Sequence, residues 1–338
     1  MTHLTTFKQS DFNDKKPSRK GWLFVIIGLA MLVIAGFTVG STSNKIEITK
    51  EQPQFWQKVA NIFDFSNEED PEYIMPVEEK ERFDVLILGI RGEDDPDAED
   101  AGPLLTDTIM VFSFDKTTKK ASIVSLPRDL YVKIDGKKTA KLNSAFENKG
   151  MKQTKELISK ITGVFIDKAV ILDFSTFEKI IDAVGGIEIT LSKPFEETQQ
   201  WGNTFFLPEG LNHLDGQNAL YYARSRFSSN DFDRSRRQQE VIFALKNKLS
   251  QHNWWSDPLK TLDIVTAIGA NIVTDFNILN IKELLDLAEE INSSDKVNKF
   301  VISTDNLVYE SRVNEAYVLL PTGDNLLGIK NLFSEIIK

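Results

Sequence analysis

The sequence predicts a three-layer α/β/α sandwich with a mixed sheet, preceded by one N-terminal transmembrane helix. Two observations support this fold class. A long apolar run without charges lies early in the chain, and beyond residue 80 short apolar segments alternate with helical patterns. Alternating strands and helices are typical of layered domains, in which helices cover the faces of a sheet. At 338 residues the chain is long enough for one large domain or two ordinary ones.

The apolar run predicts a membrane anchor at residues 21–43. No charge interrupts the chain from Gly21 to Asn44, and about 20 apolar residues suffice for a helix to cross the hydrocarbon layer. Basic residues precede the run and acidic residues follow it. The positive-inside rule therefore predicts a cytoplasmic tail at 1–20 and an extracytoplasmic C-terminal domain, as in a single-pass protein of the cytoplasmic membrane. A cleaved signal peptide is the alternative, which the length of the run disfavours.

Residues 44–80 are acidic and interrupted by prolines, which is typical of a linker. The main folded domain is predicted at 81–255. Residues 256–338 form either a C-terminal α/β extension or the remaining layer of the same domain.

Strands are predicted where short apolar segments end at glycine, proline or polar turns. Their positions are 83–89, 108–114, 120–126, 168–173, 187–191 and 298–303. Helices are predicted from apolar periodicity, with one ending at the pair Gly185-Gly186. Their positions are 143–149, 151–162, 174–184, 233–250, 257–268, 278–292 and 324–337.

Composition excludes several classes of site. The chain has no cysteine and only three histidines, which excludes a disulfide framework and a thiol nucleophile and disfavours a histidine metal site. Oxygen ligands for a hard cation such as Mg²⁺ remain possible. The formal net charge of -10 argues against a nucleic acid partner.

The segment Tyr221–Gln239 concentrates arginine in this acidic protein. Its arginines are Arg224, Arg226, Arg234, Arg236 and Arg237. We predict an extended segment through the first two, so that both side chains point to the same side. The last three open a helix. An anion site is one interpretation, and an ion-pair network with Asp231 and Asp233 is the alternative.

Helical spacing places Arg234, Arg237 and Gln238 on one face with Val241 and Leu245, which mark that face as buried. Arg236 points to the opposite face and is expected to be solvated. Inward-directed arginines oppose the helix dipole at an N-terminus, whereas a bound phosphate would balance both.

Three shorter motifs are ambiguous when taken singly. Arg128 and Asp129 follow a strand, at the end where ligands bind in open α/β sheets, but such a pair is often only a surface ion pair. Asp107 stands at the entry of a strand, where it holds Mg²⁺ or caps a turn. Lys141 and Asn143 add a cation and an amide.

The order of these motifs along the chain is more informative. It runs strand-Gly, Leu-Thr-Asp-Thr, Leu-Pro-Arg-Asp, Lys-Leu-Asn, Gly-Gly-Ile-Glu, Arg-x-Arg and Asp-Phe-x-Arg-x-x-Arg-Gln-Gln. The chain thereby resembles the LytR-CpsA-Psr family over about residues 83–250. The resemblance implies a phosphotransferase that moves a glycopolymer from a polyprenyl pyrophosphate carrier to peptidoglycan.

The resemblance also implies roles for individual residues. Asp107 would help to hold Mg²⁺. Asp129 and Asp231 would orient arginines or assist catalysis, together with Arg128 and Arg234. The residues implied to bind pyrophosphate are Arg128, Lys141, Arg224, Arg226, Arg234, Arg237 and Gln238.

Two positions depart from the family pattern. Arg91 stands where an acidic metal ligand is usual, and Leu105 stands where an arginine is usual. We therefore expect Arg91 to contact the pyrophosphate from across the site, with Glu93 or Asp94 supplying the second metal ligand. The alternative is that metal binding is weakened or lost.

Two other functions remain open from sequence. One is a non-enzymatic envelope protein that binds lipid-linked phosphate in regulation or scaffolding. The other is a hydrolase that uses water to cleave polyprenyl pyrophosphate. Retention of the arginine-rich segment favours the transferase.

Overall fold

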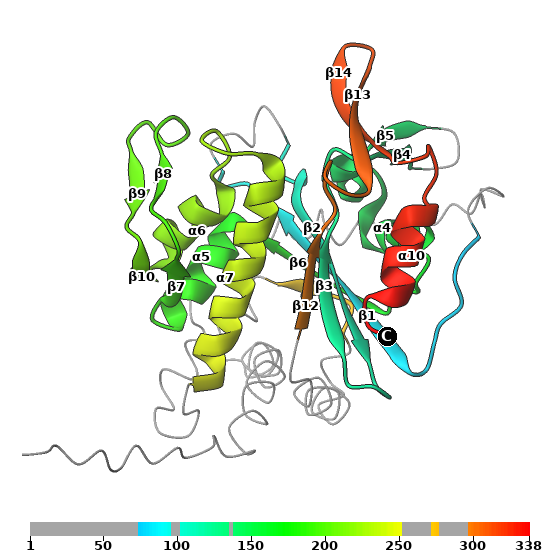
Figure 1. Cartoon of the computed structure of the whole chain (residues 1–338), viewed down its shortest axis with the longest axis horizontal. Coiled ribbons are helices and arrows are strands. Elements are labelled where there is room, and N and C mark those ends of the chain that lie inside the picture. Colours follow the sequence, from blue (N-terminus) through cyan, green and yellow to red (C-terminus); the bar gives the residue numbers. More distant parts are fainter. Residues whose placement is uncertain (1–73, 96–101, 135–137, 252–271, 277–296) are drawn as a thin grey trace, which may run out of the picture.

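The computed structural model describes residues 74–95, 102–134, 138–251, 272–276 and 297–338. Its centre is a six-stranded sheet with the order β11-β6-β1-β2-β3-β12 (Figure 1). The strands are β1 (Arg82–Ile90), β2 (Thr106–Asp115), β3 (Ala121–Ser125), β6 (Lys168–Asp173), β11 (Val273–Thr274) and β12 (Val297–Val301).

The sheet is mixed, as predicted. β1 pairs in parallel with β6, and β3 pairs in parallel with β12, whereas β2 runs antiparallel to both β1 and β3. The ends of β1 and β3 therefore lie at the same edge of the sheet as the start of β2. At that edge Gly89 faces Thr108, and a Cβ on Gly89 would lie 2.9 Å from the Thr108 Cβ. Glycine thus allows the two strands to approach closely beside the site.

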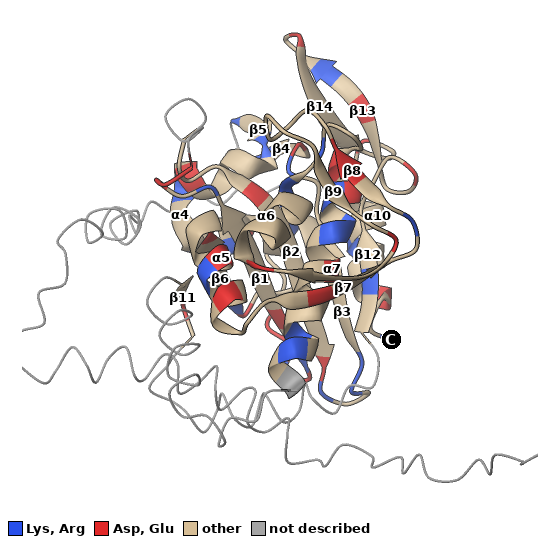
Figure 2. Ribbon diagram, turned by 90° about the vertical axis from the view of Figure 1, so that its left-hand side faces the viewer, with Lys and Arg blue, Asp and Glu red and all other residues tan. Residues whose placement is uncertain are grey.

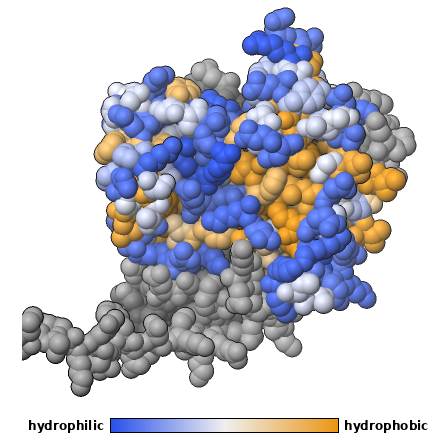
Figure 3. All heavy atoms as spheres, viewed as in Figure 1, coloured by the Kyte–Doolittle hydropathy of each residue, from blue (hydrophilic) through white to orange (hydrophobic). Residues whose placement is uncertain are grey.

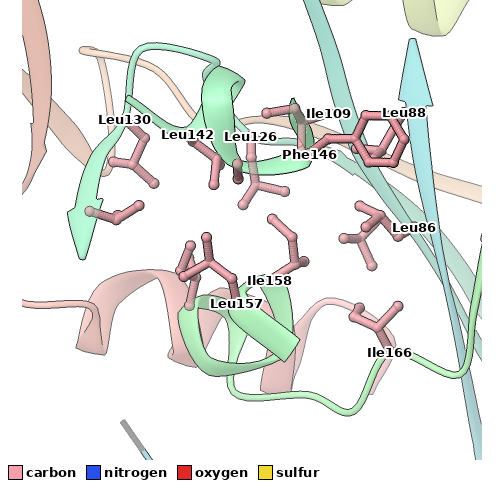
Figure 4. Packing of buried hydrophobic residues seen from close by; sticks show 14 of the residues in the cluster. Leu86, Leu88, Ile109, Leu126, Leu130, Leu142, Phe146, Leu157, Ile158 and Ile166 are labelled. Atoms are coloured by element: carbon pink, nitrogen blue, oxygen red, sulfur yellow. The ribbon is translucent and has the colours of Figure 1, made fainter. Parts of the chain in front are cut away.

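Helices cover both faces of this sheet (Figure 1). One face carries α4 (Ala145–Thr162) and α10 (Leu327–Glu335), and the other carries α5 (Phe174–Ala183), α6 (Gly216–Arg224) and α7 (Asp231–Gln251). The larger hydrophobic core lies between the sheet and α4, and it contains Leu86 and Leu88 of β1 together with Phe146, Leu157 and Ile158 of α4 (Figure 4). A second core joins α5, α6 and α7 to the strand β7 (Ile187–Leu191).

The helix boundaries follow local signals. Asp173 caps α5 by accepting a hydrogen bond from the backbone N–H of Thr176, at 2.7 Å. The break predicted between the helices at 143–149 and 151–162 is confirmed, because α4 is kinked at Gly150, which has φ 74 and ψ -179. The 3₁₀ turn η1 (Leu142–Ser144) precedes it.

Several small elements escaped the sequence analysis. They are α6, the strand β10 (Gly210–Leu214), which pairs with the predicted strand β7, and the hairpins β4 (Tyr131–Lys133) with β5 (Thr139–Lys141), β8 (Phe195–Glu197) with β9 (Phe205–Leu207), and β13 (Val308–Val313) with β14 (Ala316–Pro321). Within 256–338, β12 joins the central sheet next to β3. The helices predicted at 257–268 and 278–292 lie outside the described residues.

The predicted tail at 1–20, the predicted span at 21–43 and most of the predicted linker also lie outside the described residues. Within the part of the chain that the structure does describe, no helix combines the length and apolarity needed to cross a membrane.

Candidate functional site

A cluster of charged side chains lies where β1 and β3 end, β2 begins and α7 starts. Arg91 directly follows β1, Asp107 is the second residue of β2, Arg128 follows β3, and Arg234 lies in the first turn of α7. On the face shown in Figure 3, hydrophilic residues gather over α7, whereas an apolar area lies nearer α10. Figure 2 shows basic and acidic residues interspersed along the ribbon of the domain. Ligands in open α/β sheets bind beyond the carboxyl ends of the strands, and four residues selected from the sequence lie together at this place.

Asp107 lies at the centre of the cluster and is 9% exposed. Its Oδ1 accepts a hydrogen bond from Arg128 Nη1, and its Oδ2 lies 3.3 Å from Arg91 Nε. Burial alone would raise the pKa of Asp107. The guanidinium groups of Arg128, Arg234 and Arg91 outweigh it and hold that pKa below its ordinary value. Asp107 is therefore a buried carboxylate bound on both oxygens by arginine.

Arg128 and Arg234 share the carboxylate of Asp231 at the start of α7. Asp231 Oδ2 lies 3.3 Å from Arg128 Nε and 2.9 Å from Arg234 Nη2. Arg234 also donates to the backbone carbonyl of Asp107, at 3.1 Å. Within the described residues, however, the buried Nε atoms of Arg128 and Arg234 make no hydrogen bond. Such donors are costly to leave unsatisfied and are suited to an incoming anion.

The electrostatics of the two arginines differ. Burial lowers the pKa of Arg234 to about 10, and the positive charges of Arg128 and Arg226 add to this effect. For Arg128 burial acts in the same direction, but the carboxylates of Asp107, Asp231 and Asp129 outweigh it and raise the pKa. Carboxylates thus dominate the charge environment of Arg128, whereas burial dominates that of Arg234.

Asp129 lies between Arg128 and Lys141. Its Oδ1 is 2.7 Å from Lys141 Nζ, and its Oδ2 is 3.7 Å from Arg128 Nε. The backbone N–H of Asn143 donates to the carbonyl of Arg128, at 2.9 Å, which ties the two motifs together. Arg128, Asp129, Lys141 and Asn143 therefore form one continuous group.

Arg224 reaches the cluster through a residue that sequence reasoning missed. Asp95 Oδ2 lies 3.0 Å from Arg224 Nη2 and 3.6 Å from Arg91 Nη1. The Arg224 guanidinium also stacks over the ring of Phe174, 3.9 Å from its centroid. Glu93 and Asp94 are exposed whereas Asp95 is buried, and the expected role of Glu93 or Asp94 as a metal ligand stays a prediction.

The prediction of an extended segment through Arg224 and Arg226 was wrong. Arg224 is the last residue of α6, and the helix ends there because Ser225 adopts φ -55 and ψ 133. The backbone N–H of Arg226 donates to Gln200 Oε1, at 2.8 Å, so the loop after α6 is anchored to the segment following β8. Gln200 and this anchoring had no recognisable signal in the sequence.

Arg237 and Gln238 are placed differently from Arg234. Arg237 Nε donates to the carbonyl of Tyr222, at 2.9 Å, and its Nη2 donates to the carbonyl of Ser225. Gln238 Nε2 donates to the carbonyl of Ala223, at 3.3 Å. Both side chains thus hold the C-terminal end of α6 against α7, and their predicted contact with pyrophosphate stays a prediction.

The predicted buried face of α7 is confirmed at three positions, whereas Gln238 and Leu245 are half-buried. Arg234, Arg237 and Val241 are buried, whereas Arg236 is exposed. Arg236 pairs with Asp233 on the solvent side. Asp233 therefore pairs directly with Arg236, and its charge also partly offsets the lowering of the Arg237 pKa by burial.

The charge balance of the cluster favours an anion. Among the described residues, five cationic side chains pair with four carboxylates and the charge of Arg226 acts on Arg234, so that cations outnumber acids by two. The cations are Arg91, Arg128, Lys141, Arg224, Arg226 and Arg234, and the acids are Asp95, Asp107, Asp129 and Asp231. A diphosphate would match this excess.

The same residues do not fit the predicted Mg²⁺ site. Mg²⁺ binds oxygen ligands at about 2.0–2.1 Å in near-octahedral geometry. Both oxygens of Asp107 instead face guanidinium groups. Among the described residues, no group of three or more potential metal ligands is arranged to hold a metal.

Comparisons with known proteins identify the family. The model of the LytR_cpsA_psr family matches residues 37–333, well beyond the segment that carries the quoted motifs. The polyisoprenyl-teichoic acid–peptidoglycan teichoic acid transferase TagT of Bacillus subtilis is 28% identical over 312 residues, which cover 88% of this chain and 89% of that protein.

Solved structures share the fold. The crystal structure of B. subtilis TagV is 26% identical and superposes with a TM-score of 0.60, over 77% of this chain and 98% of that one. A structure of TagT bound to LIIa-WTA has a TM-score of 0.61 at 22% identity, over 78% of this chain and 96% of that one. Since the family model spans most of the sequence and the fold agrees, this chain belongs to the LytR_cpsA_psr family.

Proposed function

We propose that this chain is a membrane-anchored phosphotransferase that moves a glycopolymer from a polyprenyl pyrophosphate carrier to peptidoglycan. The observation that carries the proposal is the buried arginine cluster around Asp107, in which, among the described residues, cations outnumber acids by two and the Nε atoms of Arg128 and Arg234 make no hydrogen bond. The relatives named as teichoic acid transferases support the same reaction class.

The donor pyrophosphate binds between Arg128 and Arg234. Their Nε–H groups, which make no hydrogen bond within the described residues, donate to its oxygens. Arg224 and Arg226 approach from the end of α6 and neutralise further phosphate oxygens. Because these groups are held by Asp107, Asp95 and the backbone, little reorganisation accompanies charge development in the transition state. Phosphoryl transfer depends mainly on this positioning and charge neutralisation.

In the reaction, a sugar hydroxyl of peptidoglycan attacks the phosphorus that carries the glycan. The bond from this phosphorus to the bridging oxygen breaks, and polyprenyl monophosphate leaves. The hydroxyl proton passes to a carboxylate. Asp231 suits this role because its side chain is 29% exposed and contacts both Arg128 and Arg234.

Residues 21–43 anchor the protein in the cytoplasmic membrane, with the tail 1–20 in the cytoplasm and the catalytic domain outside. This topology follows from the sequence pattern. It places the arginine cluster on the side of the membrane where peptidoglycan lies.

A reconstituted transfer assay tests the proposal. The full-length protein in lipid nanodiscs is supplied with a labelled polyprenyl pyrophosphate-linked glycan and purified peptidoglycan. We expect label to appear on peptidoglycan and polyprenyl monophosphate to be released in equal amount. Arg128→Ala and Arg234→Ala abolish both products, whereas the matched control Arg236→Ala, on the exposed face of α7, retains them.

Other results would identify the rival functions. Release of polyprenyl monophosphate without labelled peptidoglycan would indicate a hydrolase. Donor binding that depends on Arg128 and Arg234 but yields neither product would indicate a non-enzymatic binding protein.

A further inference from the structure

We infer that the site binds its pyrophosphate substrate without a divalent cation, because the guanidinium group of Arg91 takes the position beside Asp107 that a cation would need. This inference rests on the proposed function. It concerns which group supplies positive charge at one corner of the site.

Both carboxylate oxygens of Asp107 are occupied by arginine. Arg91 Nε lies 3.3 Å from Oδ2, and Arg128 Nη1 donates to Oδ1, so each oxygen faces a guanidinium group. The Asp107 and Arg91 side chains are only 9% and 10% exposed. A hydrated Mg²⁺ keeps several water ligands and requires octahedral space. It would have to expel Arg91 from a buried position.

Contacts of its side chain and of the backbone that follows it hold Arg91 in place. Its Nη1 lies 3.6 Å from Asp95 Oδ2, and the Asp95 side chain is 1% exposed. The next residue, Gly92, has φ +87, and its N–H donates to the carbonyl of Pro103, at 2.9 Å. A Cβ on Gly92 would lie 2.9 Å from the Asp173 Cβ. The backbone that carries Arg91 is therefore tightly packed, and its side chain is paired within the cluster.

Two other carboxylates of the cluster, those of Asp129 and Asp231, are also paired with cations. Asp129 faces Lys141 and Arg128, and Asp231 faces Arg234 and Arg128. Any pair of these carboxylates would have to lose a cationic partner before it could ligate a metal. A buried charge that loses its partner costs several kcal/mol.

Arg91 gives the site the same net charge as a carboxylate with a bound divalent cation, so a phosphate group can still bind there. A carboxylate with a bound divalent cation carries one net positive charge. A single guanidinium carries the same charge and adds directional N–H donors. Arg91 thus replaces the charge of a metal and its ligand together.

The test measures binding of geranylgeranyl pyrophosphate to the full-length protein by titration calorimetry, in EDTA and in Mg²⁺. We expect the wild type to bind with the same Kd in both buffers. Arg91→Asp restores a carboxylate beside Asp107. We expect it to bind at least about tenfold more weakly in EDTA and to recover affinity in Mg²⁺. Arg236→Asp is the matched control, because it makes the same charge change at an exposed position and leaves both Kd values unchanged.

A second readout does not depend on the lipid. Mg²⁺ raises the Tm of Arg91→Asp but not that of the wild type, because only the variant offers two carboxylates to the ion. This comparison also shows whether the variant is folded.

The possible failures are distinguishable. Wild-type binding that requires Mg²⁺, or a Mg²⁺-dependent rise in wild-type Tm as large as that of Arg91→Asp, would overturn the inference and leave the proposed function intact. Absence of wild-type binding in both buffers would overturn the proposed function and the inference with it.

Discussion

The backbone N–H of Leu319 donates a hydrogen bond to the carbonyl oxygen of Asp129, at 2.9 Å. Leu319 also forms a parallel bridge with Leu130. These contacts attach the β13–β14 hairpin to the loop that carries Arg128, and the hairpin projects from the domain at this point (Figure 1). Burial raises the pKa of Tyr317 to about 12, with Glu310, Asp129 and Asp231 adding to the effect. Tyr317 therefore lies within electrostatic reach of the two carboxylates of the site.

We predict that Tyr317 binds the sugar acceptor. The arginines attract the anionic donor, whereas an aromatic ring near Asp129 and Asp231 suits an uncharged sugar whose hydroxyl must approach a carboxylate. Tyr317→Ala should raise KM for the peptidoglycan acceptor by about tenfold and leave donor affinity unchanged. Steady-state transfer kinetics with varied acceptor measure this effect.

Tyr309 provides the matched control. It has nearly the same exposure as Tyr317, 38% against 39%. The pairing register places it on the opposite face of the hairpin, because Tyr309 pairs with Leu320 whereas Tyr317 pairs with Arg312. An equal rise in KM for Tyr309→Ala would show that the hairpin acts only through its general structure.

Arg128 and Arg234 should dominate donor affinity. Replacing either with alanine removes a buried Nε donor and leaves Asp231 with one cation fewer. We expect each change to weaken binding of the polyprenyl pyrophosphate donor by about 2–4 kcal/mol. Calorimetric titration gives the value, and the two changes together should cost less than their sum because they share Asp231. Full additivity would argue against a shared site.

Asp107 should act as the structural partner of the arginines. Asp107→Asn leaves Arg128 and Arg91 buried without their shared carboxylate, and removal of one member of a buried ion pair costs about 3–5 kcal/mol. Inorganic pyrophosphate should restore much of this loss by pairing with the same arginines. Thermal unfolding with and without pyrophosphate measures both effects. A variant with wild-type stability, or one that pyrophosphate stabilises no more than the wild type, would contradict this role.

Sequence patterns predicted the position of the site because it depends on strand ends. Arg91, Asp107 and Arg128 each lie within a few residues of a strand boundary, and the mixed sheet brings those boundaries to one edge. Arg234 was predicted from helical periodicity, since Val241 marks the buried face. Both signals are local, and a single sequence contains them.

Other parts of the site depend on tertiary structure. Asp95 lies in an acidic loop whose neighbours Glu93 and Asp94 look equally suitable, and only the path of the chain after Gly92 turns Asp95 inward. The β13–β14 turn places Asn314 and Glu315 at φ 48 and 65. A two-residue turn of this kind usually carries Asn-Gly, so glutamate at its second position hides the signal.

A pH dependence of stability should arise far from the arginine cluster, at Asp167. Burial raises the pKa of this carboxyl to about 6 from its ordinary value of 3.8, with Asp84 and Glu78 adding to the effect. The folded state therefore holds the proton more tightly than the unfolded state. The resulting contribution to stability is fully present below pH 3.8 and is lost as the pH rises through about 6.

Asp167→Asn should remove this pH-dependent contribution while keeping the contact that the carboxyl makes. Asp167 Oδ2 accepts a hydrogen bond from the backbone N–H of Asp84, at 2.7 Å, and an asparagine amide oxygen can accept the same bond. We expect the variant to be more stable than the wild type at pH 7 by about 1 kcal/mol, less than the full shift implies because the carboxyl is partly solvated. The difference should vanish near pH 4. Urea unfolding across this range measures it, with Asp305→Asn as the exposed control. A stability difference that is the same at pH 4 and pH 7 would assign the effect to packing, because only titration of Asp167 makes it depend on pH.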